Sequence, residues 1–334
     1  MSGPFGSSQW MYKSGEVIAW GGSRMITAGG TSGNGGSAAG NANSIDYVNA
    51  TAASGNSVDF GDLSAVRISL MSVSATGRMV FLGGNPSYVN IMEYVTPAST
   101  GNVTDFGDLV VGSAFNGHQA SSGIRGVFHT GSRSAANGGS YHDDIDYITI
   151  ASTGNSLDFG DIATTGAGNA GCSNGTRGVS GGGYMGSATV NVIEYITVAV
   201  PGNATDFGDL TVARRNFGTA SDGTRGIWAG GNGNDVIDYI TIYSTGNATD
   251  FGNLLASWDD AGGSGLGNAT RGVFGGGASS GKSDVIQYIT IASTGNASDF
   301  GNLLAAANGV TACSDATRGV FGGGNPTASG NINV

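Results

Sequence analysis

The chain has 334 residues, of which 63 are glycine and 11% are charged, and its formal net charge at pH 7 is −11. Without a basic cluster to neutralise phosphates, the composition argues against nucleic acid as a partner. No apolar run approaches the ~20 residues of a membrane span, and Met1–Trp10 lacks the regions of a signal peptide, so we expect neither membrane insertion nor classical secretion.

A repeat of roughly 48 residues runs along the chain, and such a period is typical of propellers and solenoids. Each unit contains an Arg, an apolar run that usually ends in Gly-Gly, a Tyr and an Asp-Phe-Gly triplet. The residues that mark the units are Arg24, Arg78, Arg125, Arg177, Arg225, Arg271 and Arg318; Tyr47, Tyr94, Tyr147, Tyr195, Tyr239 and Tyr288; and Phe60, Phe106, Phe159, Phe207, Phe251 and Phe300. Seven units account for the whole length, which predicts a single domain over residues 1–334.

The N-terminus carries the piece that the last unit lacks. Phe5 precedes Arg24 by 19 residues, and each internal Phe of the repeat precedes the next Arg by 18 to 20. The seventh unit ends at Asn331–Val334, without its Tyr and triplet. We therefore expect Ser2–Ser7 to form the outer strand of the last unit and to close a ring, because an open stack would leave exposed sheet edges.

Turn chemistry divides each unit into four strands, as the fifth unit illustrates. Phe217–Ser221 is predicted as the first strand and Arg225–Ala229 as the second, joined by a tight Asp222-Gly223 turn. Val236–Tyr243 is predicted as the third strand, and the fourth lies around Asp250-Phe251. Both faces of this sheet are apolar, so each unit must be stacked between two neighbours.

This order of residues resembles the kelch repeat of β-propellers, in which a diglycine ends the second strand, Tyr lies on the third and an aromatic residue on the fourth. Phe stands here where kelch repeats have Trp. The resemblance implies an all-β fold, a seven-bladed β-propeller of four-stranded kelch-like blades, closed by the N-terminal strand. A solenoid is the alternative.

The periodic residues are interpreted as scaffold. The Phe of each triplet is expected to pack between blades, and its Asp to bond turn amides, with calcium binding as the alternative. The acidic residue before most of the tyrosines and the repeated Arg are expected to form inter-blade ion pairs. Cys172 and Cys313 are expected to be small buried hydrophobes without a disulfide.

All three histidines fall in the third unit, at 118, 129 and 142. His118 is predicted to lie roughly opposite Val127, on the same face as His129, so that Asp143 or Asp144 could complete a zinc site. The spacing matches no recognised metal motif, and hydrogen-bonded histidines are the preferred interpretation. No catalytic motif is recognised either, so we expect no metal, no cofactor and no enzymatic activity.

Sequence variation gathers in the connections between second and third strands and between blades, which we expect to share one face of the ring. Loops on a rigid scaffold usually carry recognition, so this face is the predicted binding surface. Trp258 could stack on a sugar ring whose hydroxyls bond carboxylates. The candidate residues are Tyr141, His142, Asp143, Asp144, Tyr184, Trp258, Asp259 and Asp260.

The wording of the repeat, as in Ile148–Asn155 and Gly202–Leu210, is similar to that of propeller proteins of tailed, particularly marine, bacteriophages. This resemblance implies a non-enzymatic component of the virion, assembled in the host cytoplasm and exposed on the particle as a capsid decoration or tail-associated protein. Its partners would be other virion proteins. The alternative is a carbohydrate-binding module for host-surface glycan, and a kelch-like enzyme ranks last.

Overall fold

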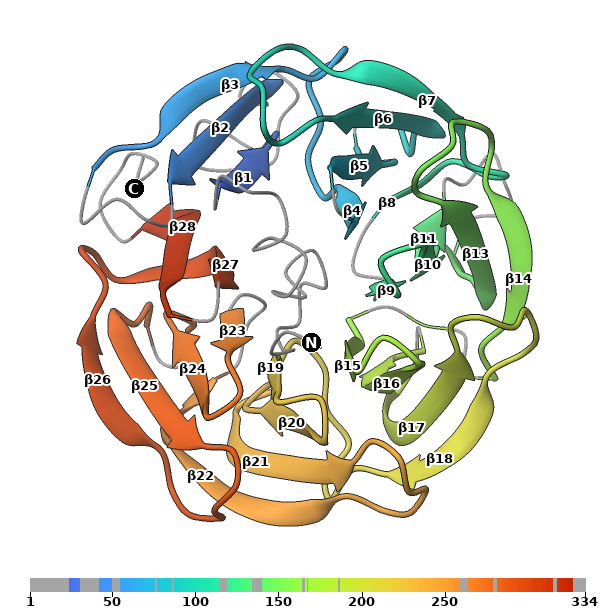
Figure 1. The fold of residues 1–334 in the computed structure, drawn as a ribbon. Coiled ribbons are helices and arrows are strands. Elements are labelled where there is room, and N and C mark those ends of the chain that lie inside the picture. The colour runs from blue at the N-terminus through green and yellow to red at the C-terminus, as the bar shows by residue number, and fades with distance from the viewer. Residues whose placement is uncertain are drawn as a thin grey trace.

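The fold of the chain is a ring of antiparallel β-sheets, a β-propeller (Figure 1). A computed structural model describes residues 24–30, 42–49, 55–75, 77–85, 87–114, 119–133, 140–163, 166, 168–185, 187–258, 264–278, 281–314 and 317–326. Among these residues there is no helix, and hence none that could cross a membrane.

Six sheets have the character of blades. The first has three strands, β1 (Arg24–Ala28), β2 (Ser44–Asn49) and β3 (Val58–Asp62). The other five have four strands each: β4 (Met71–Ala75), β5 (Arg78–Leu82), β6 (Ile91–Val95) and β7 (Thr104–Asp108); β9 (Gln119–Ser121), β10 (Arg125–His129), β13 (Asp144–Thr149) and β14 (Leu157–Asp161); β15 (Ala170–Ser173), β16 (Arg177–Tyr184), β17 (Thr189–Thr197) and β18 (Thr205–Asp209); β19 (Gly218–Ser221), β20 (Arg225–Ala229), β21 (Asn234–Thr241) and β22 (Thr249–Trp258); β23 (Ser264–Gly267), β24 (Arg271–Gly275), β25 (Val285–Thr290) and β26 (Ser298–Asn302).

A two-stranded hairpin, β27 (Ala307–Ser314) and β28 (Gly319–Pro326), lies between the sixth blade and the first. Ala312 of β27 packs with Leu266 of the sixth blade, and Val320 of β28 packs against the core cluster that contains Met25 and Ile26 of the first blade. The hairpin therefore contacts both neighbours, so the chain forms a ring and not an open solenoid.

The structure corrects the predicted number of blades. It shows six, where the sequence predicted seven with four strands each. The difference arises because only the first two strands of the last repeat, β27 and β28, fall within the described residues. The predicted third strand at 331–334 and the predicted closing strand at Ser2–Ser7 lie outside them.

A β-bulge aims the repeated Phe into the space between blades. In each blade the ladder between the third and fourth strands shifts by one residue at the position before the Tyr. In the second blade, Met92 pairs with Gly107 and Glu93 with Asp105, so Phe106 is skipped. Phe106 packs edge-on against Tyr94, with ring centroids 6.1 Å apart, and the other five blades repeat this contact at 5.8 to 6.0 Å.

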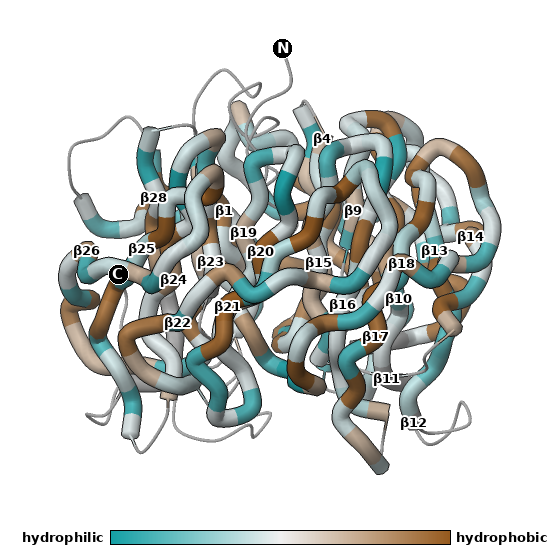
Figure 2. The backbone as a smooth tube through the Cα atoms, turned by 90° about the horizontal axis from the view of Figure 1, so that it is seen from below, coloured by the Kyte–Doolittle hydropathy of each residue, from teal (hydrophilic) through white to brown (hydrophobic). Residues whose placement is uncertain are grey.

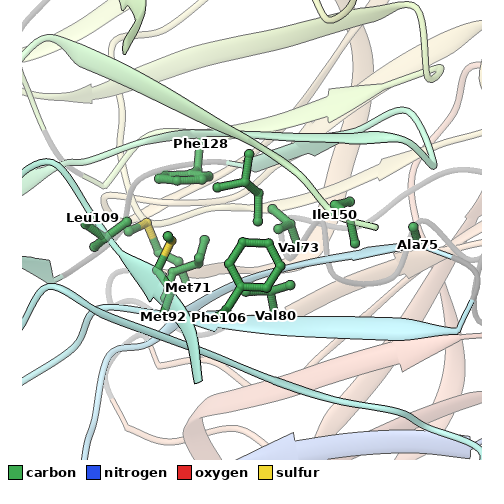
Figure 3. Packing of buried hydrophobic residues seen from close by; sticks show 11 residues of the cluster. Met71, Val73, Ala75, Val80, Met92, Phe106, Leu109, Phe128 and Ile150 are labelled. Carbon is green, nitrogen blue, oxygen red and sulfur yellow. The ribbon is translucent and has the colours of Figure 1, made fainter. Parts of the chain in front are cut away.

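The cores lie between neighbouring blades, as the interface of the second and third blades illustrates (Figure 3). Phe106 of the second blade and Phe128, Ile148 and Ile150 of the third belong to one buried cluster. The prediction that the repeated Phe packs between blades is therefore confirmed for this interface. Each blade covers the apolar face of the next, which is the reason why a single blade could not be stable alone.

The predicted ion pairs with the acidic residues were wrong for the six repeated arginines from Arg24 to Arg271, none of which pairs with a described carboxylate. Arg78 stacks on Tyr94 of its own blade, 4.1 Å from the ring centroid, and donates a hydrogen bond to the carbonyl of Ile150 in the next blade at 3.0 Å. Five of the repeated arginines make this carbonyl bond, and six stack on their Tyr. The repeated arginines therefore do join neighbouring blades, but through a hydrogen bond to a backbone carbonyl oxygen. The positive charge of the guanidinium lies over an aromatic ring instead of beside a carboxylate.

Candidate binding site

The two faces of the ring differ in the connections that they carry. Short strand β8 (Ser113–Ala114), which precedes the third blade, pairs with β11 (Ser132–Arg133) from the connection inside that blade, and β11 pairs with β12 (Ser140–Tyr141). An isolated bridge joins Ile68 to Asn85 in the same way before and inside the second blade. The inter-blade connections and the second-to-third connections thus share one face, as predicted; we call it the variable face, and β11 and β12 lie on it at the lower edge of Figure 2.

The opposite face is built from nearly identical turns. In the first-to-second turn, the side-chain oxygen of Asn174, Asp222 or Asn268 accepts hydrogen bonds from the backbone amides two and three residues later. In the third-to-fourth turn, an Asn side chain accepts a hydrogen bond from the outer strand of the preceding blade; these residues are Asn102, Asn155, Asn203, Asn247 and Asn296. We call this face the uniform face, and the side-chain oxygens of its repeated Asn and Asp residues accept hydrogen bonds from the backbone of the ring.

Three side chains on the variable face form an aromatic and cationic group between the third and fourth blades. Tyr141, in β12, and Tyr184, at the end of β16, meet edge to face, with ring centroids 5.8 Å apart and ring planes at 90°. The guanidinium of Arg215 lies 4.3 Å from the ring centroid of Tyr184. All three residues are partly exposed. We call Tyr141, Tyr184 and Arg215 the tyrosine cluster.

Acidic residues adjoin Tyr141 in the sequence and along β13. The side chain of His142 approaches Asp144, with Nδ1 3.8 Å from Oδ2, and both residues are half-buried. Asp144 is directly opposite Asp161 in the ladder of β13 and β14. Burial raises the pKa of Asp161, and the negative charges of Asp143, Asp144 and Asp158 raise it further.

Of the predicted site residues, Tyr141, His142, Asp143, Asp144 and Tyr184 lie at this border between the third and fourth blades, partly exposed. The prediction of Trp258 as an exposed stacking residue was wrong. Its side chain is 2% exposed and packs edge-on against Phe274, 6.3 Å away, in the space left by Gly230 and Gly277. Asp259 and Asp260 lie outside the described residues.

The strand register expected around the histidines was wrong. Val127 is opposite Ala120 in the ladder, not opposite His118, which lies outside the described residues. His129 is buried, and its Nε2 lies 2.8 Å from the backbone oxygen of His142. Within the described part of the chain, no group of three or more His, Cys, Asp and Glu side chains is placed to hold a metal ion.

Arg215 and Asp161 were not predicted as part of the binding site, and two buried ion pairs were not predicted at all. Arg67 bonds Glu93, and Arg214 bonds Asp238 at 2.7 Å, each arginine lying seven residues after the Phe of a triplet. The signal was available, because Arg67 and Arg214 occupy the same position of the repeat and Arg214-Arg215 is a pair outside the periodic arginines. Arg215 itself does not recur, so the repeat could not assign it a structural role.

A hollow lies at the connections of the second blade. It has a volume of about 480 Å³ and is lined by Ser87, Tyr88, Val89, Asn90, Ile91, Val110, Val111 and Gly112. Ser87 and Tyr88 both have positive φ, 78° and 51°, which residues other than glycine rarely adopt. The lining carries no charged side chain, so this hollow offers shape and hydrogen bonds without an ionic anchor.

No protein-family model and no curated protein matches this chain.

Proposed function

We propose that this protein is a non-enzymatic interaction module that docks on other proteins through its variable face, as a component of a tailed-phage virion. The observation that carries the proposal is the asymmetry of the two faces. The repeated Asn and Asp side chains in the turns of the uniform face accept scaffold hydrogen bonds, whereas the variable face presents Tyr141, Tyr184 and Arg215, which do not recur in the repeat. Tyr and Arg are enriched at the energetically dominant positions of protein interfaces.

The partner class follows from charge and surface chemistry. The net charge of −11 disfavours nucleic acid, and the exposed Tyr and Arg side chains are of the kind found in protein interfaces. A capsid or tail protein would meet a rigid ring whose outer turns are held by inter-blade bonds. Aromatic and guanidinium groups that are already packed lose little conformational freedom on binding.

The test of this function is attachment to phage particles. The protein should be present in purified particles in a fixed ratio to the capsid or tail protein, measured by mass spectrometry. Particles that lack it should bind added wild-type protein, while a Tyr141→Ala/Tyr184→Ala variant should bind at least tenfold more weakly. Tyr243→Ala is the matched control, because Tyr243 is an exposed Tyr in a turn of the uniform face. Absence of the protein from particles would contradict the proposal.

Carbohydrate binding is a second candidate, favoured by the pairing of Tyr141 and Tyr184 beside Asp143 and Asp144. Aromatic rings can stack on the CH face of a sugar while carboxylates accept bonds from its hydroxyls. A glycan array probed with wild-type protein, Tyr184→Ala and Tyr243→Ala separates the candidates. Binding that only Tyr184→Ala abolishes supports the sugar site, and no bound glycan leaves the protein partner.

For the ring itself we propose that β27 and β28 begin a seventh kelch-like blade, which the N-terminal strand completes. Phe300 supports this proposal, because it is 54% exposed while the equivalent Phe in the other five blades is 2% exposed. The outer strand of the sixth blade thus lacks, among the described residues, the neighbour that covers every preceding blade.

A further inference from the structure

One repeated interface in the ring shows how an outer strand is held by the next blade. The residue before the Tyr accepts a hydrogen bond from the backbone amide that lies four residues after the Phe of the preceding blade. The amides of Ser64, Ala163, Thr211 and Leu255 thus bond Glu93, Glu194, Asp238 and Gln287. At the remaining interface, Val110 makes the bond through the hydroxyl of Ser156, which in turn bonds Asp146.

The same interface contains a second repeated contact, made by the third-to-fourth turn. In the second blade, the amide of Gly101 donates to the carbonyl of Phe60 at 2.7 Å, and the amide of Val103 donates to the carbonyl of Asp62 at 3.0 Å. The amide of Asp62 donates to the side chain of Asn102 at 3.0 Å. Four further interfaces repeat these three bonds with the equivalent residues.

The first blade carries the same set of groups, but their partners are not among the described residues. Asp46 is half-buried, although the five equivalent residues are only 0 to 4% exposed. Val48 is likewise half-buried where the second blade has buried Val95. The turn at Gly55, Asn56 and Ser57 begins with Gly-Asn, as the other third-to-fourth turns do. No outer strand faces it among the described residues.

We infer that this surface of the first blade is the docking site of Phe5–Gln9, in the register of the five internal interfaces. The amide of Gly55 then donates to the carbonyl of Phe5. The amide and the carbonyl of Ser7 bond the side chain of Asn56 and the amide of Ser57, and the amide of Gln9 bonds Asp46. This inference rests on the proposed completion of the ring and adds the contacts that fix its register.

The length of the chain before the first described strand fits this occupant. Phe5 precedes Arg24 by 19 residues, and Phe60 precedes Arg78 by 18, so the same span links an outer strand to the following blade. Gly6 occupies the position of Gly208, where a Cβ would lie 2.5 Å from the carbonyl carbon of the facing Gly246. Glycine is thus present where the facing turn demands it.

A disulfide test reports the register. Ser7 and Ser57 stand where directly hydrogen-bonded residues such as Asp62 and Val103 stand in the next interface, and a disulfide needs Cα atoms roughly 4.4–6.8 Å apart. Under mild oxidation we expect a Ser7→Cys/Ser57→Cys variant to form the linked peptide within one chain, at least tenfold faster than the matched Ser8→Cys/Ser57→Cys variant, whose residue 8 points to the other side of the strand. Peptide mass mapping identifies the linked pair apart from Cys172 and Cys313.

Each other outcome overturns the inference in a defined way. Faster linkage of the Ser8→Cys variant would overturn the register while leaving the completed ring intact. Linkage between two chains, seen when labelled and unlabelled protein are mixed, would assign the surface to a second copy. No linkage in either folded variant would overturn both the inference and the completion of the ring. Particle attachment by wild-type protein is measured separately, so its failure is distinguishable from each of these.

Discussion

At the scale of single residues, the buried ion pairs are the least expected feature of this acidic, weakly charged chain. The side chains of Arg214 and Asp238 are both 0% exposed, and Arg214 also bonds the carbonyl oxygens of Gly230 and Trp228. Burial lowers the pKa of Arg214, and the facing carboxylate of Asp238 opposes that effect. The pair therefore holds the connection before the fifth blade against that blade, at the expense of desolvating two charges.

Removing one partner of this pair should be strongly destabilising. We expect Asp238→Asn to lower the free energy of unfolding by about 3–5 kcal/mol, because the guanidinium of Arg214 is left buried without a counter-ion. Denaturant unfolding measures the loss. The Arg214→Met/Asp238→Asn double variant is the control and should recover part of it; a double variant as unstable as the sum of the single changes would contradict the assignment.

The carboxylate of Asp161 makes stability depend on pH in the opposite sense from a salt-bridged acid. Its pKa is raised by burial and by Asp143, Asp144 and Asp158, so its contribution is present below the unfolded pKa of about 3.9 and is lost as pH rises through the folded pKa. Asp161→Asn should therefore raise the melting temperature at pH 7 and leave it unchanged near pH 3.

The control for this prediction is Asp209→Asn, at the same repeat position in the fourth blade. Asp209 is opposite Val192 in the ladder, whereas Asp161 is opposite Asp144. Melting curves of the two variants between pH 3 and 8 should therefore diverge above pH 4. An equal gain from both changes would show that the acidic pair at Asp161 is not the cause.

At the scale of elements, the glycine of each Asp-Phe-Gly triplet allows the third-to-fourth turn of the next blade to approach the outer strand closely. Gly208 and Gly301 have nearly the same backbone conformation, with φ of 143° and 142°. A Cβ on Gly208 would lie 2.5 Å from the carbonyl of Gly246, whereas a Cβ on Gly301 would meet no described atom within 4 Å. The two positions share the cost of the backbone angle and differ only in the approach of the next blade.

Comparing Gly208 with Gly301 gives a prediction in which the cost of the positive φ is the same for both variants and cancels. Gly208→Ala should destabilise the protein by about 1–3 kcal/mol more than Gly301→Ala, because only the first change forces a methyl group against a neighbouring carbonyl. Thermal and denaturant unfolding of the two variants supply the comparison. Equal losses would mean that backbone strain alone explains the glycine.

The repeat made the elements predictable where local chemistry sets them. Arg225–Ala229 was predicted with the bounds that β20 has, because a turn residue with positive φ, Gly223, precedes it and a diglycine follows. The third strand was predicted at Val236–Tyr243 but runs over Asn234–Thr241 as β21. The shift arises because Ile242 already bonds Thr224 across the uniform face.

The candidate site was predictable only in part, for a physical reason. Tyr141 and Tyr184 were predicted because they lie in the variable connections, and their proximity follows from the stacking of the third and fourth blades. Trp258 was predicted for the same reason, yet β22 extends over ten residues and carries the indole ring into the core. Whether a non-repeated aromatic residue points outward depends on matching space in other blades, here at Gly230 and Gly277, which a linear pattern does not reveal.

At the scale of the whole molecule, the stability of a ring of blades depends on nearest neighbours. The inner strands contact each other in order around the ring: β4 with β9, β9 with β15, β15 with β19, β19 with β23, and β23 with β27. In such an array each blade is stabilised by its own ladder and by two interfaces, so opening one interface exposes the two blades that border it. The interface that the N-terminal strand is proposed to complete lies between the hairpin of β27 and β28 and the first blade, so these two elements would be exposed if it opened.

Deletion of Met1–Ser8 tests whether closure matters for the whole ring. The proposed docking of Phe5 buries one large aromatic side chain, whose loss from a protein interior costs about 3–5 kcal/mol, so we expect a clear fall in the melting temperature. Hydrogen exchange should accelerate first in β1, β2, β27 and β28, because these strands border the opened interface.

Deletion of Met1–Gly3 alone is the matched control, since it shortens the same terminus but keeps Phe5 and the residues after it. This shorter form should melt with the full chain and retain slow exchange in β1 and β28. If both deletions left melting and exchange unchanged, the contacts of β27 and β28 with the neighbouring blades would be sufficient to hold the ring. In that case the half-burial of Asp46 and Val48 would be a property of the finished molecule.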